Sequence, residues 1–438
     1  MYWLYSLLLA LALLLSTPWW LTQMLRHGKY RTGWRERLGR VPGRLLRNTA
    51  EETIWIHAVS VGEVLAVSGV IEALKAQLPG WRIVVSTTTD TGQRLARQRF
   101  GEDNVFYLPL DLRFAVRPYL QALRPKLLML AESEFWPNLL RHARLSGAQV
   151  AVVNARVSDR SLPRYLRFRR LVRPMLQHID LFLVQSAEAA RRLVQIGAPP
   201  ERVQVSGNLK FDIRPPAQST VITGFAKSIN REHKRPVIVA GSTLDGEETM
   251  LLEMFRKVES CHPDAVLVLA PRHPERFDAV ASLIASSGVH FQRRSQWDGE
   301  TGIAGGVFLL DSIGELASFY EFADVAFVGG SLVPRGGHNI LEAAQFGPAI
   351  LVGPHTENFR DIVEAFRRAD GLRVVTPQSL TAAVMQLLEN SDERAGLGKR
   401  AQEVMHAQQG ATEKTVAALH ALLNAHMSPA SVVWEERA

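Results

Sequence analysis

The chain has 438 residues, of which 47% are hydrophobic and 21% charged. This composition excludes a largely disordered chain and allows two or three domains with large cores. The only cysteine, Cys261, excludes an intramolecular disulfide framework. The net charge of +8 favours an acidic partner, such as a membrane surface, a nucleic acid or an anionic substrate.

Residues 1–25 are predicted to form a membrane anchor helix. No charged side chain precedes Arg26, and about 20 apolar residues suffice to cross the hydrocarbon core of a bilayer. A signal peptide is one alternative, but the basic n-region of such a peptide is missing. A buried core helix is another, although this segment is apolar all round. The sequence does not distinguish an anchor that spans the bilayer from one embedded in one leaflet.

A basic flank follows the predicted anchor. Residues 26–50 contain eight Lys or Arg residues and one acid, Glu36. Such a flank indicates the cytoplasmic side of a membrane, and it is also suited to contact anionic lipid head groups. It is equally well explained as a topology signal alone. We therefore expect membrane lipids, and no nucleic acid, as the partner of the basic charge.

The rest of the chain alternates apolar strand-like runs with helix-like segments, which predicts parallel sheets covered on both faces. The stretch 210–220 contains two prolines and no periodicity, so it is predicted to be a linker. The predicted fold class is α/β, with two Rossmann-like, doubly wound domains behind the anchor. The predicted ranges are 1–25 for the anchor, 26–215 for the first domain and 216–425 for the second. Strands are expected at 53–60, 81–89, 125–133, 147–155, 179–186, 236–243, 265–273, 307–312, 325–330 and 349–355.

Ligands of such sheets bind beyond the carboxyl ends of the strands, so polar residues directly after strands are candidate site residues. The stretch "FVGGSLVPRGGHNILEA" contains two glycine pairs before the start of a helix. Free backbone N–H groups at a helix start attract phosphate, and glycines such as Gly337 let a ligand approach the backbone. Arg272 is suited to a phosphate and Glu342 to ribose hydroxyls. This pattern predicts a nucleotide cradle; a tight turn with Glu342 as a capping residue is the alternative.

Other signals are missing. The chain has no phosphate-binding P-loop, no dinucleotide-binding glycine motif, and no clustered Cys/His or Asp-x-Asp set for a metal. His338 is predicted to be a hydrogen-bonding or structural residue, and no metal or cofactor is expected. Phosphate binding without a metal motif, across two Rossmann-like domains, is typical of glycosyltransferases with the B-type architecture (GT-B). In that architecture the cleft between the domains joins donor to acceptor.

Six motifs follow one another in a specific order: "HAVSVGE", "AESEFWPN", "VNARVSDRS", "GNLKFD", "PRHPERF" and "FVGGSLVPRGGHNILEAA". Together with the apolar N-terminus they resemble the bacterial 3-deoxy-D-manno-octulosonic acid (Kdo) transferase family, over roughly residues 1 to 420. The resemblance implies transfer of Kdo from CMP-Kdo to the lipid A precursor (lipid IVA) in lipopolysaccharide biosynthesis, with inversion at the anomeric carbon. It also implies an inner-membrane enzyme with its catalytic domains on the cytoplasmic face.

The resemblance also assigns roles to residues. It implies that Glu63 is the catalytic base and that Glu132 belongs to the active site. The residues implied to contact CMP are Pro271, Arg272, Ile313, Gly314, Glu315, Asn339, Ile340, Leu341 and Glu342. Further candidates are Ser60, Ser242, Lys210, Gly337 and His338.

Alternatives stay open for several of these residues. Glu63 is otherwise a helix-start carboxylate with a stabilising role, and Glu132 and Glu134 otherwise cap the "FWPN" turn. Lys210 either contacts an acidic ligand or pairs with a carboxylate near the linker. Alternative functions are a GT-B transferase that uses a UDP-sugar on a lipid acceptor, a nucleotide-sugar epimerase, and a lipid-binding scaffold without activity. The number of Kdo residues transferred, the oligomeric state and the role of the C-terminal tail do not follow from the sequence.

Overall fold

A computed structural model describes residues 2–27, 32–46, 51–213, 220–229, 235–303 and 305–427. The chain divides into two compact units. Unit 1 is discontinuous in sequence: it comprises the residues up to Asp212 and those from Gln409 onward. Unit 2 is Ile213–Gln408. Most of the predicted linker, residues 214–219, lies outside the described residues.

Unit 1 is built around a parallel sheet, which has seven strands within the described ranges. The strand order is β3-β2-β1-β4-β5-β6-β7. The strands are β1 (Glu52–His57), β2 (Trp81–Thr87), β3 (Val105–Tyr107), β4 (Pro125–Ala131), β5 (Gln149–Ala155), β6 (Leu181–Val184) and β7 (Val203–Val205). The α-helices are α1 (Tyr2–His27), α2 (Trp34–Arg37), α3 (Val61–Gln77), α4 (Asp90–Phe100), α5 (Arg113–Leu123), α6 (Pro137–Leu145), α7 (Leu162–Arg167), α8 (Arg169–Leu176), α9 (Ala187–Ile196) and α18 (Ala411–Met427). Short 3₁₀ helices are η1 (Gly43–Leu46), η2 (Glu102–Asn104), η3 (Pro200–Arg202) and η4 (Leu209–Phe211).

Helices cover both faces of this sheet, because its strands are apolar on both faces. Every residue of β5 is buried, and its side chains alternate between two cores. Val150 and Val152 belong to a core with residues of α5, α6 and α9. Ala151 and Val153 belong to a core with residues of α3 and α18. The predicted doubly wound arrangement is therefore confirmed for unit 1.

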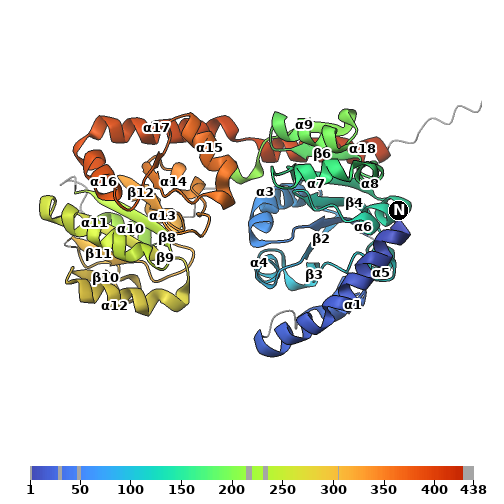
Figure 1. The fold of residues 1–438 in the computed structure, drawn as a ribbon, viewed down its shortest axis with the longest axis horizontal. Coiled ribbons are helices and arrows are strands. Elements are labelled where there is room, and N and C mark those ends of the chain that lie inside the picture. Colours follow the sequence, from blue (N-terminus) through green and yellow to red (C-terminus); the bar gives the residue numbers. More distant parts are fainter. Residues whose placement is uncertain are drawn as a thin grey trace, which may run out of the picture. The chain divides into compact units, whose positions relative to one another are not determined.

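The placement of α18 corrects the predicted domain boundary. Residues 411–425 were expected to close the second domain, but Leu419 and Leu423 are buried in the unit 1 core. The backbone carbonyl of Leu422 accepts a hydrogen bond of 2.8 Å from Gln149 Nε2, and Asp212 accepts one of 2.8 Å from the backbone N–H of Gly410. Figure 1 shows α18, in red, among the blue and green elements of unit 1. Periodicity predicts an apolar helix face, but it does not say which sheet that face covers.

Unit 2 contains a second parallel sheet, also seven-stranded in the part of the chain that is described, with the order β10-β11-β9-β8-β12-β13-β14. The strands are β8 (Val237–Thr243), β9 (Val266–Pro271), β10 (Phe291–Arg293), β11 (Gly306–Leu309), β12 (Val325–Val328), β13 (Ala349–Val352) and β14 (Arg373–Val374). The α-helices are α10 (Thr220–Ser228), α11 (Glu247–Cys261), α12 (Phe277–Ser287), α13 (Leu316–Phe319), α14 (Leu341–Ala344), α15 (Arg360–Arg368), α16 (Leu380–Glu389) and α17 (Ser391–Gln408). Short 3₁₀ helices are η6 (Pro274–Arg276), η7 (Arg294–Gln296), η8 (Tyr320–Phe322) and η9 (Glu357–Phe359).

Each face of the second sheet also has its own core. Residues of α11, α12 and α16 pack on one face. An aromatic cluster lies on the other side of β11, where Phe225 contacts Phe308, Phe319 and Trp297 with ring centroids 4.8 to 6.4 Å apart. Such clusters bury a large apolar area for few residues. Both predicted Rossmann-like domains are thus present.

The N-terminal segment forms the predicted helix, α1. Among the residues that the structure describes, no helix combines the length and the apolar character that crossing a bilayer requires.

The strand orders mark one point in each sheet where a ligand site is expected. In unit 1 the chain winds from β1 outward to β3 and then returns to β4 beside β1. In unit 2 the corresponding neighbours are β8 and β12. The loops that follow such a pair of strands diverge to opposite faces of the sheet and leave a crevice between them. The residues after β1 and β4, and those after β8 and β12, are therefore the first candidates.

Candidate active site

Glu63 lies at the crevice of unit 1, in the first turn of α3. Its Oε2 atom accepts a hydrogen bond of 2.8 Å from the backbone N–H of Val59. Its Oε1 atom accepts one of 3.0 Å from Ser60 Oγ. These contacts stabilise the turn between β1 and α3, as expected of a helix-start carboxylate. Each oxygen keeps a lone pair with which it can still accept a proton.

The surroundings of Glu63 favour its protonated form. The residue is only 9% exposed. Burial, together with the charges of Glu132 and Glu134, raises the pKa of Glu63 to about 7, although the hydrogen bonds from the Val59 N–H and Ser60 Oγ lower it. A carboxyl group with a pKa near the working pH is well suited to accept a proton during a reaction. The geometry therefore allows both a structural and a chemical role.

Glu132 directly follows β4 and forms an ion pair with Lys210, whose Nζ lies 2.8 Å from Glu132 Oε1. Its backbone is in the left-handed region, with φ of +55°, which is costly for a residue with a side chain and is often found at functional sites. Two alternatives were open for Lys210, contact with an acidic ligand or pairing with a carboxylate. In the structure Lys210 pairs with a carboxylate, that of Glu132. Ser60, Glu63, Glu132 and Lys210 thus all lie at the carboxyl edge of the unit 1 sheet.

The Glu132–Lys210 pair depends on a residue that the sequence did not single out. Asn154 Oδ1 accepts a hydrogen bond of 3.0 Å from the backbone N–H of Leu209, which holds η4 and hence Lys210 in place. Asn154 also has a positive φ, of +54°. An asparagine at the end of an apolar strand is the signal from which this role was predictable, because asparagine tolerates that conformation better than most residues.

The suggestion that Glu132 or Glu134 caps the "FWPN" turn is not supported. The first N–H groups of α6 are bound by Asp111, which accepts from Asn138 at 3.0 Å and from Leu139 at 2.7 Å. Burial and the charge of Glu132 raise the pKa of Glu134. The charge of Glu134 in turn raises the pKa of Glu63.

In unit 2, Arg272 is close enough to His338 and to Glu342 for its charge to affect both side chains. Burial raises the pKa of Glu342, while the charge of Arg272 lowers it. Burial and the charges of Arg272 and His273 lower the pKa of His338 to about 4. His338 is therefore neutral at pH 7, and its buried Nε2 atom has no hydrogen-bond partner among the described residues; the hydrogen-bonding or structural role expected from the sequence stays a prediction. Arg272 is exposed and follows β9, whose last residue is Pro271.

The turn after β12 is held by Glu247, a fully buried carboxylate in the first turn of α11. Its two oxygens accept hydrogen bonds of 2.7 to 3.0 Å from the backbone N–H groups of Gly330, Ser331 and Leu332. These N–H groups are consequently not available to a ligand phosphate. The predicted phosphate site at the helix start near Asn339 is not tested by these contacts, and the sequence analysis does not predict the role of Glu247.

Glycines in this turn are required by the packing of the protein itself. A Cβ atom at Gly329 would lie 2.5 Å from the backbone oxygen of Ser242, and one at Gly330 would lie 2.8 Å from the ring of His338. Gly337 has φ of +74° and donates a hydrogen bond of 2.7 Å to the carbonyl of Gly330. The turn is therefore a rigid strand-to-helix connection, and the glycines do not by themselves indicate a ligand.

The remaining predicted residues lie on the same carboxyl edge of the unit 2 sheet. Asn339 Oδ1 accepts a hydrogen bond of 3.2 Å from the N–H of Leu341, the first residue of the short helix α14; Ile340 is the N-cap residue of that helix. Ile313 is 65% exposed, and Gly314 has φ of +90°. Glu315 pairs with Arg294 at 3.1 Å. The roles of these residues in binding CMP stay predictions. Ser242, at the end of β8, has φ of +55°.

No group of three or more His, Cys, Asp or Glu residues within the described ranges is arranged to hold a metal ion.

Comparison with known proteins defines the class and then the family. The architecture matches that of a putative UDP-N-acetylglucosamine 2-epimerase from Listeria monocytogenes, with a TM-score of 0.55 and 13% identity over 86% of this chain and 97% of the other. That likeness establishes the fold shared by GT-B glycosyltransferases and such epimerases. Residues 32–213 match a family model described as 3-deoxy-D-manno-octulosonic-acid transferase, and residues 225–404 match glycosyl transferases group 1.

Two relatives settle the family. The 3-deoxy-D-manno-octulosonic acid transferase of Haemophilus influenzae is 36% identical over 82% of this chain and 85% of its own length. That of Bordetella pertussis is 36% identical over 84% of this chain and 86% of its own length. This chain belongs to the 3-deoxy-D-manno-octulosonic acid transferase family.

Proposed function

We propose that this protein is a glycosyltransferase that moves Kdo from CMP-Kdo to the lipid A precursor lipid IVA, in lipopolysaccharide biosynthesis. The transfer inverts the anomeric carbon and needs no metal ion. Family membership supports the class of enzyme and the donor. The observation that carries the mechanism is the buried carboxyl of Glu63, whose pKa is raised to about 7 at the crevice of unit 1.

The reaction is a single displacement. A hydroxyl of the acceptor attacks the anomeric carbon of Kdo and gives its proton to Glu63 as the new C–O bond forms. The bond between that carbon and the phosphate oxygen breaks, and CMP leaves with the electron pair. Arg272 stabilises the charge on the departing phosphate, and Glu342 accepts hydrogen bonds from ribose hydroxyls. Attack opposite to the leaving group inverts the anomeric centre.

The test is a product analysis with the full-length chain. Lipid IVA is incubated with the protein and CMP-Kdo, and the molecular mass of the lipid is measured by mass spectrometry. We expect its mass to rise by one or more Kdo units, with EDTA present or absent, and no transfer from UDP-sugars. Transfer from a UDP-sugar alone, epimerisation of one, or no transfer at all would contradict the proposed donor. Loss of activity in EDTA that a divalent ion restores would contradict the metal independence.

We also propose that α1 attaches the protein to the inner membrane, with both units on the cytoplasmic face. One side of α1 is docked on unit 1: Tyr2 Oη lies 2.7 Å from His178 Nε2, and Ser6 Oγ accepts from Asn138 Nδ2 at 3.0 Å. Arg113 and Arg117 line a surface hollow beside Ser6. Apolar side chains cover the exposed side: Trp3, Leu4, Leu7, Leu8, Leu11, Leu14 and Leu15. An apolar helix face beside basic residues fits an anionic lipid surface.

Charges placed on the exposed face of α1 should detach the protein from membranes. The double substitution Leu8→Glu, Leu15→Glu changes residues that are 56% and 72% exposed, so it leaves the docked side intact. Each leucine contributes about 1.5–3 kcal/mol on burial, so partition into anionic vesicles should fall at least about a hundredfold. Vesicle sedimentation measures it. Val374→Glu, at an exposed apolar residue of unit 2, is the control. Equal sedimentation of all three proteins would refute this attachment.

A further inference from the structure

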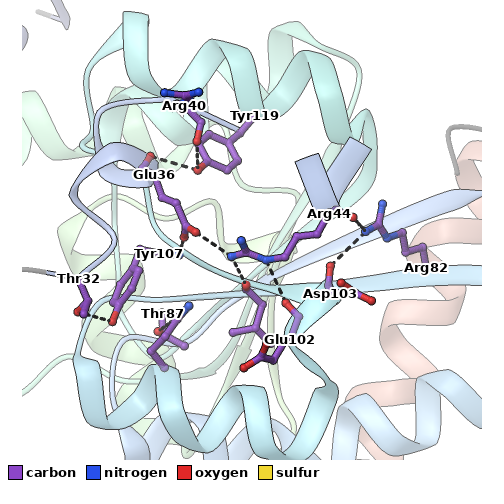
Figure 2. Close-up of polar contacts among 12 residues, drawn as sticks. Thr32, Glu36, Arg40, Arg44, Arg82, Thr87, Glu102, Asp103, Tyr107 and Tyr119 are labelled. Atoms are coloured by element: carbon purple, nitrogen blue, oxygen red, sulfur yellow. Dashed lines mark hydrogen bonds and ion pairs between the residues drawn. The ribbon is translucent and has the colours of Figure 1, made fainter. Parts of the chain in front are cut away.

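The segment that follows the N-terminal helix is fastened to the sheet edge of unit 1. We call residues 32–46 the flank segment. Its only acid, Glu36, accepts hydrogen bonds from Arg44 Nη2 at 2.7 Å and from the backbone N–H of Tyr107 at 2.8 Å. Tyr119 Oη donates to the carbonyl oxygens of Glu36 and Arg40, at 3.1 and 3.3 Å. Figure 2 shows these contacts, which tie the flank segment to β3 and α5.

Both ends of the flank segment are also fixed. Near its start, Thr32 Oγ1 donates to Asp90 Oδ1 at 2.9 Å. Near its end, Arg44 donates to the carbonyl oxygens of Glu102 and Val105 at 3.1 and 3.0 Å, and Arg82 donates to that of Leu45 at 2.8 Å. The flank segment is thus a structured part of unit 1, and its basic residues do more than signal topology.

One arginine of this segment, Arg37, contacts the turn that follows β2. Arg37 ends α2, and its Nη2 atom donates a hydrogen bond of 2.6 Å to the carbonyl oxygen of Thr88. Its guanidinium lies over the ring of Tyr107, 4.5 Å from the ring centroid. The carbonyl of Arg37 accepts from the N–H of Leu110 at 2.8 Å. Thr88 belongs to the turn between β2 and α4, so Arg37 holds that turn from outside.

The same turn holds the loop that carries Glu63. The backbone N–H groups of Thr88 and Thr89 donate to the carbonyl of Val59 at 3.2 and 3.1 Å. Thr89 Oγ1 donates to the same oxygen at 3.2 Å. The N–H of Val59 in turn donates to Glu63 Oε2. A continuous series of hydrogen bonds therefore leads from Arg37 through Thr88 and Val59 to Glu63.

We propose that Arg37 is a positioning residue for the reaction, which acts through Thr88 and Val59 to aim the carboxylate of Glu63. This inference rests on the proposed role of Glu63 as the base. A charge-assisted hydrogen bond to the carbonyl of Thr88 fixes the β2–α4 turn, and the three donors of that turn fix the carbonyl of Val59. The N–H of Val59 then keeps its direction towards the carboxylate.

Arg37→Gln removes the charge-assisted bond and should lower kcat. Misplacement of a catalytic group by about 1 Å costs on the order of a hundredfold, so we expect a loss of about tenfold to a hundredfold. KM for CMP-Kdo should change little, because the proposed donor residues belong to unit 2. Arg35→Gln, at an exposed arginine of the same helix, is the matched control and should leave kcat unchanged.

The pH profile distinguishes positioning from general damage. The Val59 N–H lowers the pKa of Glu63, whereas Glu132 and Glu134, which face it from the β4–α6 connection, raise it. Lys210 neutralises part of the charge of Glu132. If Arg37 aims the Val59 N–H, its loss weakens the contribution that lowers the pKa. The acid limb of kcat/KM should then shift to higher pH in Arg37→Gln and stay in place in Arg35→Gln.

Two further measurements keep the inference falsifiable. Hydrogen exchange of residues 58–63 should speed up in Arg37→Gln, while that of β8 stays as in the wild type. Arg37→Met keeps the aliphatic stem against Tyr107 and replaces the glutamine variant if that one does not fold. Unchanged kcat, pH profile and exchange in a folded variant would overturn the role of Arg37. If Glu63→Gln itself retained activity, the proposed base would fail instead, so the two failures are distinct.

Discussion

Glu63→Gln should abolish most Kdo transfer while leaving the fold and CMP affinity intact. The amide keeps the size of the carboxyl; its oxygen can accept from the Val59 N–H and its NH2 group can donate to Ser60 Oγ, but it cannot take the acceptor proton. Removal of a general base typically costs about 10²–10⁴ in rate. Turnover at saturating donor and acceptor is the measurement. CMP titration calorimetry reports the donor site separately.

The control for this substitution lies on the same helix. Glu72 is an exposed residue of α3, so Glu72→Gln makes the same chemical change away from the crevice and should keep wild-type turnover. Glu63→Asp shortens the reach by one methylene and should also be poor. A Glu63→Gln protein that keeps more than about a tenth of wild-type turnover would exclude the base role. A loss that unfolding fully explains would leave Glu63 with its helix-start role alone.

The same hypothesis fixes the sign of the pH dependence. Glu63 acts as a base only when ionised, and burial raises its pKa to about 7. As pH falls through 7 the carboxylate is protonated, so kcat/KM should fall about tenfold per pH unit on the acid side. Above pH 7 it should reach a plateau. The residual activity of Glu63→Gln should lack this limb, because an amide does not titrate.

The sequence predicts most of the buried strands because a strand in a doubly wound sheet is apolar on both faces. The strands it missed are β3, β7, β10 and β14, which have only two or three residues each. Runs of that length carry no periodicity. The strand order could not be predicted in this way, because nothing in the local pattern indicates that β4 pairs with β1. This pairing brings Glu132 near Glu63.

The sequence also could not predict which buried carboxylates accept hydrogen bonds from backbone N–H groups far away along the chain. Asp111 binds N–H groups of Asn138 and Leu139, and Glu247 binds those of residues 330–332. Their partners lie 27 or more residues along the chain, so no local motif marks them. The sequence did identify which polar residues follow strands, because the local apolar pattern is enough to locate the ends of long strands. Those residues were candidates for the site because ligands of such sheets bind beyond the carboxyl ends of the strands.

Arg272→Ala should weaken CMP binding about tenfold to a hundredfold. Hydrogen bonds to charged groups contribute about 1.5–3 kcal/mol, which corresponds to that range. Arg272 is exposed directly after β9 and lies near enough to Glu342 for its charge to oppose the rise that burial causes in the pKa of Glu342. It is therefore free to turn towards a phosphate while Glu342 takes the ribose hydroxyls. Calorimetric titration of CMP into the full-length protein measures the change.

Companion variants separate charge from geometry. Arg272→Lys keeps the positive charge but loses the planar fork of donors, so its CMP affinity should lie between those of wild type and Arg272→Ala. Glu342→Ala should also weaken CMP binding, through the ribose. Arg368→Ala, at another exposed arginine of unit 2, is the control. If folded Arg272→Ala and Glu342→Ala both bound CMP as the wild type does, the donor site would have to lie elsewhere in unit 2. If Arg368→Ala weakened binding equally, the effect would reflect the overall charge of the unit and not a contact with the phosphate.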